Sequence, residues 1–293
     1  MEVLLAALVH GLLLGAVYTS MVLSMWLLWD VARVVNLAHG DLVLIGAYTA
    51  WWLHDQHGWE PFAALLVVLP AALLVGPLLH RLVIAPLLGR PPLTSVLVTL
   101  GMSVMLQGVL RSMFTSMPQA ARSALDGGFL LGRVDVPTAR LVAASVAVVL
   151  VAATARALRS TKTGTSIRAV AQNREGARLV GIELPRVVAV TVVISLALAM
   201  AAGMLLVPFE WVQPALGPIL TVKVFAVAAI SGLRSVRAVV VSAVGLAVLE
   251  ALLLASDPFR GARLGFMGAG ALLVLALLVR PLSVEGALPE GRT

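Results

Sequence analysis

Three polar residues that can carry protons or hydrogen-bond a solute lie close together in a largely apolar region. They are Asn36, His39 and Asp41, within the stretch Asn-Leu-Ala-His-Gly-Asp, and an apolar run continues from there to Ala50. Polar groups inside a membrane are costly unless they pair with each other or face water. These residue types therefore require either local partners or a wet path.

Two interpretations of this stretch follow from the residues alone. One is a capped helix start, in which Asn36 caps the helix and Asp30 pairs with Arg33 at the i,i+3 spacing. The other is a polar gate or pathway segment at a broken helix, because irregular backbone at membrane depth is found where it lines a cavity. The chemistry of the residues leaves both open.

Catalytic signatures are missing from the chain. It contains no HExxH, no GxSxG and no GxxxxGK[ST], and it has no cysteine. These patterns mark a zinc protease helix, a serine nucleophile and a phosphate-binding loop for ATP. His54 and His57 flank Asp55, but they are more typical of a wet interfacial loop than of a metal site. We expect no enzymatic activity, no metal and no cofactor bound by this chain.

The composition indicates which kind of element must position the polar residues. Of 293 residues, 60% are hydrophobic and only 12% are charged, with a mean hydropathy of +1.03. A soluble domain has about 45–50% apolar and ~25% charged residues. This excludes a soluble globular protein, a disordered chain and a nucleic-acid-binding domain. The net charge of +7 suits basic cytoplasmic loops and contact with anionic membrane lipid.

We predict an all-α integral membrane protein with eight or nine transmembrane helices, forming a single transmembrane domain over residues 1–293. No two-residue alternation indicates a membrane barrel, so helices must satisfy the backbone. The second and seventh segments are short and polar, so one or both could be re-entrant or broken. The expected spans are near 3–28, 37–53, 61–79, 93–110, 140–156, 187–207, 218–233, 236–255 and 264–280.

The distribution of basic residues predicts the orientation of these spans. Assigning the basic loop 156–186 to the cytoplasm places 14 Lys and Arg inside and 6 outside, in agreement with the positive-inside rule. The N-terminus is then outside and the C-terminus inside, unless a short span is re-entrant. The longest external segment would be 111–139.

Two charged residues lie within expected spans. Lys223 is five residues from the outer end of its span and Glu250 is five from the outer end of the next. Each is therefore about 7–8 Å deep along its helix. A short turn joins the two spans, so the two spans are antiparallel neighbours. The two charges could then pair near an outer gate, because each charge alone in lipid is costly. The alternative is that each side chain reaches the interface separately.

The cytoplasmic loop of about 158–186 is long for a simple connection between helices. Residues 166–180 contain no proline and predict a short amphipathic helix, and Gly181 suits a helix stop. Such a helix fits either a groove of a partner protein or an anionic lipid surface. The residues alone leave both open.

Three segments carry a resemblance to a known family. Residues 36–42 resemble the N-x-A-H-G-[ED] segment of branched-chain amino acid ABC-transporter permeases, and residues 167–182 resemble the large cytoplasmic loop of that family. Within the latter, residues 175–181 resemble the EAA-x3-G core, with Gly176 in place of the first Ala. Residues 222–250 resemble the last third of the family more loosely. The turn 231–238 departs from the pattern, because Arg234 and Arg237 stand where small residues or Pro are usual.

The resemblance implies a permease subunit of an ATP-driven importer for branched-chain or related hydrophobic amino acids in the bacterial cytoplasmic (inner) membrane. Its implied partners are a second homologous permease, two ATP-binding subunits that use the ATP, and a periplasmic or lipid-anchored binding protein. The implied path residues are Asn36, His39 and Asp41. The residues that would couple to the ATPase are Arg174, Glu175, Gly176, Ala177 and Gly181. Permeases for amides and urea share much of this pattern, and a self-contained secondary transporter or channel is the other alternative.

Overall fold

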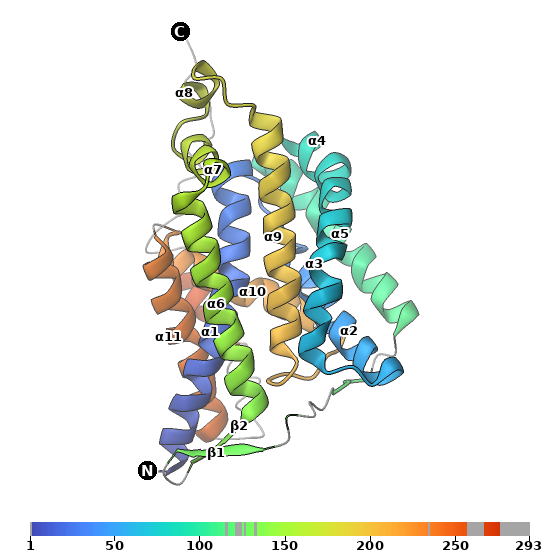
Figure 1. Cartoon of the computed structure of the whole chain (residues 1–293), viewed down its shortest axis with the longest axis vertical. Coiled ribbons are helices and arrows are strands. Elements are labelled where there is room, and N and C mark those ends of the chain that lie inside the picture. Colours follow the sequence, from blue (N-terminus) through green and yellow to red (C-terminus); the bar gives the residue numbers. More distant parts are fainter. Residues whose placement is uncertain are drawn as a thin grey trace.

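The computed structural model describes residues 2–114, 117–120, 125, 127–131, 134–233, 235–256 and 267–275. These residues form a bundle of helices with one short hairpin (Figure 1). The helices are α1 Glu2–Ala32, α2 His39–His57, α3 Leu65–Leu79, α4 Ala85–Leu87, α5 Pro92–Met113, α6 Thr138–Ser160, α7 Lys162–Gln172, α8 Arg174–Leu179, α9 Leu184–Leu206, α10 Leu216–Ser231 and α11 Val236–Ser256. Residues 267–275 are also helical and lie in the expected ninth span.

Six helices of the described part are long and apolar enough to cross a membrane. They include a composite span, Pro61–Leu87, in which a 3-10 turn (Pro61–Ala64) precedes α3 and a π-helical turn (His80–Ile84) joins α3 to α4. Prolines within this span remove backbone donors, which favours such irregular turns. The helices α2 and α10 are the shorter, more polar pair. The predicted all-α multi-pass membrane protein is therefore confirmed, and its count of eight or nine is consistent with the structure.

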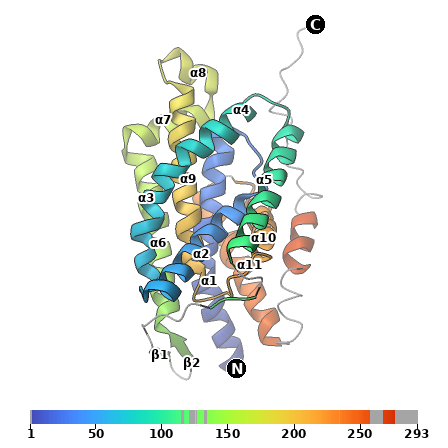
Figure 2. The same ribbon diagram turned by 90° about the vertical axis from the view of Figure 1, so that its right-hand side faces the viewer.

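Two helices, α1 and α9, run through the interior of the bundle. The helix α1 packs against α11, α9 and α6, while α2 packs against α9 and α10 (Figure 1). The helix α5 lies at an edge, away from α6 and α7 (Figure 2), and packs mainly against α2. The most buried elements are thus those next to the Asn-Leu-Ala-His-Gly-Asp stretch.

The chain between α1 and α2 turns back into the bundle. The ring of His39, the first residue of α2, contacts Met21 of α1, which is eleven residues before the end of that helix. At 1.5 Å per residue, α2 therefore begins about 16 Å below the end of α1. Residues 33–38, which are not helical, cover this distance. This is the broken arrangement that the short, polar second span allowed.

The cytoplasmic loop contains two helices where one was predicted. Residues 166–180 are divided at Asn173, whose extended backbone (φ −154°, ψ 105°) ends α7 and whose side chain accepts a hydrogen bond from Gly176 N to cap α8. Asparagine is a favoured N-cap because its side chain competes with the helical backbone for hydrogen bonds. The expectation of one continuous helix was therefore wrong. Gly181 ends α8 at φ +83°, as its type predicted.

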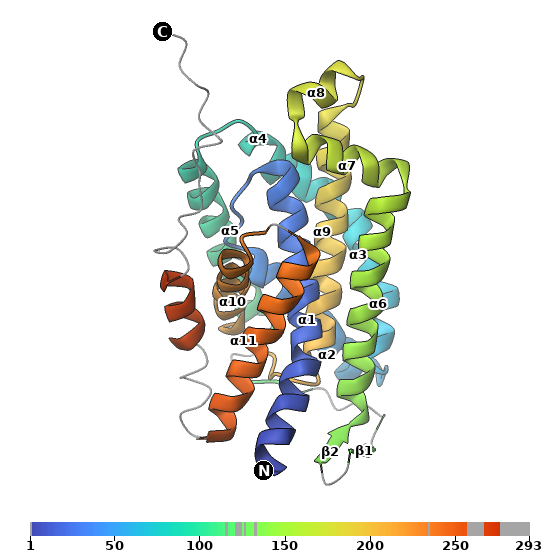
Figure 3. The same ribbon diagram turned by 90° about the vertical axis from the view of Figure 1, so that its left-hand side faces the viewer.

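The opposite end of the bundle carries the N-terminal end of α1 and an antiparallel hairpin, β1 (Gly128–Leu131) and β2 (Val134–Pro137) (Figure 3). The hairpin lies in the segment expected to be the longest external one. A bridge between Gln119 and Val212 ties the same segment to the connection after α9. Because α7 and α8 lie at the other end, a cytoplasmic α7–α8 loop places the N-terminus outside, as the basic residues predicted.

Candidate functional site

The three polar residues of the first motif are all buried, each with its own partner. His39 Nε2 lies 2.9 Å from Ser24 Oγ and 3.1 Å from the Met21 carbonyl oxygen, both on α1. Asp41 Oδ2 accepts a hydrogen bond from Ser103 Oγ of α5. The motif thus joins α2 to α1 and to α5 at the depth where α2 begins.

Asn36 holds the backbone just before α2. Its Oδ1 accepts a hydrogen bond from Ala38 N at 3.1 Å, while Ala38 occupies the N-cap position of α2. Asp30 and Arg33 do approach at i,i+3, with 3.8 Å between Oδ1 and Nη2. The Asp30–Arg33 part of the capped-start interpretation is confirmed, but Asn36 does not cap α2, because Ala38 is the N-cap residue and no side chain caps it. Residues 33–38 form a re-entrant segment rather than a simple helix start.

Two threonines satisfy the irregular backbone at this depth. Thr99 of α5 accepts from Leu37 N at 3.0 Å, and its hydroxyl lies 3.1 Å from the Val35 carbonyl oxygen. Thr221 of α10 accepts from Gly40 N at 3.0 Å and contacts the Leu37 carbonyl at 3.1 Å. Non-helical backbone inside a membrane requires partners of this kind. Sequence reasoning missed both residues.

The sequence contained a signal for the polar face of α5. Ser95, Thr99, Ser103 and Gln107 follow at intervals of four, so they share one face of the helix. Three of them are buried, whereas apolar side chains of α5 such as Leu97 and Val104 are exposed. The face of α5 that looks into the protein is therefore the polar one.

Several atoms of the first motif have no hydrogen-bond partner within the described part of the chain. They are Asn36 Nδ2, His39 Nδ1 and Asp41 Oδ1, all buried. Buried polar atoms are almost always paired, so unpaired ones need an explanation. Donors and acceptors gathered at the start of a broken helix could serve a polar solute when the surrounding helices move.

The structure brings Lys223 and Glu250 together. Lys223 Nζ lies 3.1 Å from Glu250 Oε2 and donates a 2.7 Å hydrogen bond to the hydroxyl of Tyr18, which itself donates to Glu250 Oε2 at 2.8 Å. Glu210, in the connection after α9, approaches Lys223 at 3.9 Å. This cluster joins α1, α10 and α11. Tyr18 and Glu210 were not foreseen, because nothing in their local sequence indicates the contact.

The residues of the second motif lie at the end of the bundle that carries α7 and α8. Ala177 is buried, Glu175 and Gly181 are exposed, and Gly176 receives the Asn173 cap. Arg174 donates a hydrogen bond to the carbonyl of Val31, in the last turn of α1. Burial lowers the pKa of Arg174 below its ordinary value, and the nearby cations of Arg33 and Arg178 add to the effect.

A second arginine connects the same two segments, but its side chain comes from the end of α1 and its acceptor lies in α7. Arg33, the first residue after α1, donates to the carbonyl of Ala171 in α7 at 3.2 Å. The α7–α8 loop is thus hydrogen-bonded to Val31, just before the end of α1, and to Arg33, just after it, where the chain turns back toward Asn36. Beyond this junction, the apolar side chains of Leu179 and Val180 are 88% and 77% exposed at the end of α8.

The remaining histidine pair makes only local contacts. His54 Nδ1 lies 3.0 Å from the Trp59 carbonyl, and the ring of His57 packs on Trp52. Among the residues that the structure describes, no group of three or more His, Cys, Asp or Glu side chains could hold a metal ion. Arg234, one of the two unexpected arginines, lies outside the described residues.

Comparison with known proteins gives a family for this arrangement. Residues 7–279 match the family described as "Branched-chain amino acid transport system / permease component". The chain is 27% identical to the high-affinity branched-chain amino acid transport system permease protein LivH of Escherichia coli, over 94% of each chain. It is 26% identical to the corresponding protein BraD of Pseudomonas aeruginosa, over 96% of this chain and 95% of that one.

A solved structure described as PsaBC from Streptococcus pneumoniae in complex with Fab has a TM-score of 0.45 and 14% identity, covering 96% of this chain and 91% of that chain. That likeness is too distant to add to the argument. The family match covers nearly the whole chain, including the re-entrant segment, the α7–α8 loop and the Lys223 cluster. The protein is therefore a multi-pass membrane protein that belongs to the family of permease components of branched-chain amino acid transport systems.

Proposed function

We propose that this chain is the transmembrane permease subunit of an ATP-binding-cassette importer for branched-chain or related hydrophobic amino acids in the bacterial inner membrane. The chain would form the substrate pathway and catalyse no covalent chemistry. Its partners would be a second, homologous permease, two ATP-binding subunits that consume the ATP, and an external binding protein that sets most of the substrate choice.

One observation carries the coupling part of this proposal. The loop that resembles the EAA-x3-G core is hydrogen-bonded to the junction between α1 and the re-entrant segment, through Arg174 to Val31 and through Arg33 to Ala171. The re-entrant segment then leads directly to Asn36 and the start of α2. A displacement of α8 by a partner would therefore be transmitted to the buried polar motif through six non-helical residues, 33–38.

The exposed end of α8 supports docking of a partner at this loop. Leu179 and Val180 expose large apolar side chains next to Gly181, beyond the helical bundle. Exposed apolar groups next to charged ones are typical of an amphipathic element that fits a partner groove. The ATP-binding subunits are the partner that the motif implies.

The pathway part of the proposal rests on the polar face shared by α2 and α5. Asp41, Ser103 and Gln107 form a chain of hydrogen bonds, with 3.0 Å between Gln107 Nε2 and Ser103 Oγ. Toward the end of α2 that carries His57, an open cavity of about 700 Å³ lies between the same two helices, lined by Ile45, Trp51, Leu106 and others. An aliphatic amino acid needs both an apolar surface and polar groups, and this face provides them.

The decisive experiment is to co-express the chain with a second, homologous permease, the ATP-binding subunits and the binding protein from the same genome. ATP hydrolysis is then measured in proteoliposomes with and without leucine, isoleucine or valine. We expect hydrolysis that is stimulated by the binding protein and its ligand. A chain that purifies alone and moves these solutes without ATP would overturn the proposal in favour of a secondary transporter.

Two glycines give a matched test of the coupling loop. Gly181 (φ +83°) and Gly58 (φ +65°) both have left-handed backbones with open space around the position of a Cβ atom. Alanine at either site brings similar backbone strain, about 1–2 kcal/mol. Gly181→Ala alters the loop at α8, whereas Gly58→Ala alters the opposite end of the protein, after α2. We expect stimulated hydrolysis to fall for Gly181→Ala and to be retained for Gly58→Ala.

A further inference from the structure

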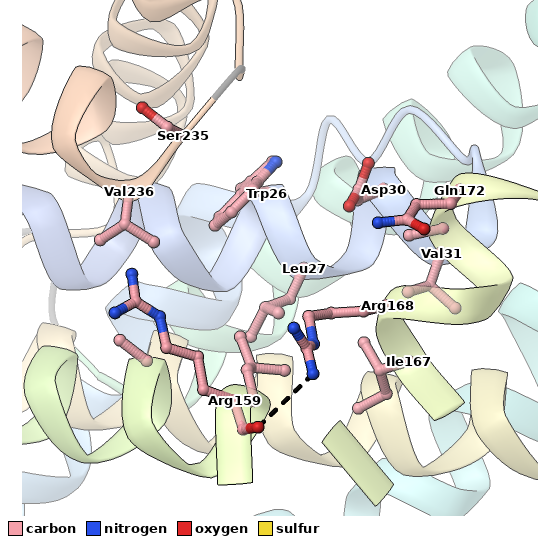
Figure 4. A pocket seen from close by; sticks show the side chains of 13 residues that line it. Trp26, Leu27, Asp30, Val31, Arg159, Ile167, Arg168, Gln172, Ser235 and Val236 are labelled. Carbon is pink, nitrogen blue, oxygen red and sulfur yellow. Dashed lines mark hydrogen bonds between the residues drawn. The ribbon is translucent and has the colours of Figure 1, made fainter. Parts of the chain in front are cut away.

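An open pocket of about 340 Å³ lies beside the end of α1 that α7 covers, at the base of the α7–α8 loop and away from α2 and α5. It is bounded by α1, by the end of α6, by α7 and by the start of α11 (Figure 4). On this side of the bundle, α1 lies between α11 and α6 (Figure 3). The first function proposed for the chain gives this pocket no role.

The pocket has two cations beside the ring of Trp26. Arg159 at the end of α6 and Arg168 of α7 both line it; in Figure 4 the Arg159 side chain extends toward α1, while the Arg168 guanidinium turns toward the Arg159 carbonyl. Their one mutual contact is a 3.4 Å hydrogen bond from Arg168 Nη2 to the Arg159 carbonyl. Each guanidinium has five N–H donors, so most remain available. The indole Nε1 of Trp26 is buried and has no partner within the described part of the chain.

One carboxylate also lines the pocket but does not neutralise it. Asp30 lies 3.8 Å from Arg33, which is outside the pocket lining. The two pocket arginines have no carboxylate within ion-pair distance in the described part of the chain. The local field therefore favours an anion with several acceptor oxygens, and a phosphate group is the common ligand of paired arginines.

The other surfaces of the pocket are apolar. Leu27, Ile167 and Val236 line it, and the helices α6 and α11 expose further apolar side chains, including Val149 and Val241, on the way toward the membrane centre. Tryptophan and arginine together at a membrane–water boundary suit the headgroup level of a bilayer. A soluble anion would use only the polar part of such a site.

We propose that this pocket binds the phosphodiester headgroup of an anionic phospholipid from the cytoplasmic leaflet. Arg159 and Arg168 bind the phosphate oxygens, the ring of Trp26 lies beside the headgroup, and the acyl chains follow the apolar flanks of α6 and α11. The lipid links the start of α11 to the base of the α7–α8 loop. None of the residues that line the site belongs to the polar motif of residues 36–41 or to α8.

The first test measures which lipid the full-length chain retains. The chain is purified in detergent with equimolar phosphatidylglycerol and phosphatidylcholine of identical acyl chains, and bound lipid is counted by native mass spectrometry. We expect preferential retention of phosphatidylglycerol. An Arg159→Gln/Arg168→Gln variant should lower that preference by about fivefold for each charge removed. The control variant Arg178→Gln/Arg186→Gln removes two exposed arginines from the same end of the protein and should retain the preference.

The second test locates the lipid. Brominated phosphatidylglycerol quenches nearby tryptophan, and the part of the signal due to Trp26 is the difference between the native chain and Trp26→Phe. We expect stronger quenching of that part by brominated phosphatidylglycerol than by brominated phosphatidylcholine. Arg159→Lys/Arg168→Lys keeps both charges and should retain the preference, which separates loss of binding from loss of folding.

Three outcomes would overturn the proposal. Equal retention of both lipids by the native chain would show that the pocket does not select an anion. Displacement of phosphatidylglycerol by millimolar inorganic phosphate would assign the pocket to a soluble anion. Because the chain has no cysteine, a Ser235→Cys variant that forms disulfide-linked dimers in the membrane would show that a second copy covers this face.

Discussion

Lys223 and Glu250 form an ion pair between α10 and α11, with 3.1 Å between Nζ and Oε2 and only 10% of each side chain exposed. The pair is completed by Tyr18 of α1, whose hydroxyl lies between the two charges and hydrogen-bonds both. Glu210 approaches the same Nζ from the connection that follows α9. The cluster therefore fixes α1, α10 and α11 relative to one another, with Tyr18 close to the middle of α1.

Breaking this pair on one side should destabilise the protein strongly. Removing one partner leaves the other charge buried and uncompensated, at a cost of about 3–5 kcal/mol. Lys223→Met and Glu250→Gln should each lower the thermal unfolding midpoint in detergent, and the double variant should lose less than the sum of the two. Asp30→Asn, which breaks the more exposed pair with Arg33, should cost about 1 kcal/mol or less. Additive losses for Lys223 and Glu250 would refute the coupling.

The contact of α2 with α9 depends on two glycines. A Cβ atom at Gly46 would collide with the backbone carbonyl of Met200, and one at Gly203 would collide with that of Val43. Gly46→Ala should therefore force the helices apart, with a loss of about 1–3 kcal/mol or more in unfolding free energy. Gly101→Ala and Gly108→Ala in α5 are matched controls, because a Cβ atom there meets nothing within 4 Å. They should leave the unfolding midpoint unchanged or raise it, since alanine favours a helix. Equal effects at Gly46 and Gly101 would contradict the close packing.

These contacts show which features the sequence could predict. Span positions and the approach of Lys223 to Glu250 followed from local hydropathy and residue counting, because each depends on distances along one helix or across one short turn. The burial of Gly46 against Met200 and of Tyr18 against Glu250 joins residues far apart in the chain. No local pattern specifies which helix faces which, so neither contact could be read from the sequence.

The polar residues of the first motif illustrate the same limit. The sequence indicated that Asn36, His39 and Asp41 needed partners, but not that these would be Ser24, Ser103 and backbone groups. The four-residue spacing of polar groups in α5 was a usable signal for Ser103 and Thr99. The division of the cytoplasmic loop at Asn173 was also foreseeable, because asparagine is a favoured N-cap residue. Its side chain accepts a hydrogen bond from the backbone N–H three residues later, here that of Gly176.

Ser103 should be needed to keep Asp41 in place. Its hydroxyl donates a hydrogen bond to Asp41 Oδ2, while Oδ1 is unpaired within the described residues. Ser103→Ala would remove this donor from a buried carboxylate, at a cost of about 1–3 kcal/mol. We expect lower stability and lower transport in proteoliposomes. Ser112→Ala removes a hydroxyl from the same helix that bonds only the Val109 carbonyl, and should retain both. Wild-type transport and stability in Ser103→Ala would show that Asp41 needs no such donor.

Docking and transmission at the cytoplasmic loop should be separable, because different residues serve them. Leu179 and Val180 are exposed beyond the bundle, whereas Arg174 reaches inward to the Val31 carbonyl. Leu179→Ser/Val180→Ser should reduce co-purification of the ATP-binding subunits. Arg174→Gln should leave co-purification intact but lower substrate-stimulated ATP hydrolysis by about tenfold, the effect of losing one hydrogen bond made by a charged group. Arg178→Gln, in the same helix but exposed, is the matched control and should hydrolyse ATP normally. If Arg174→Gln and Arg178→Gln behave alike, α8 does not act on the substrate path through the end of α1.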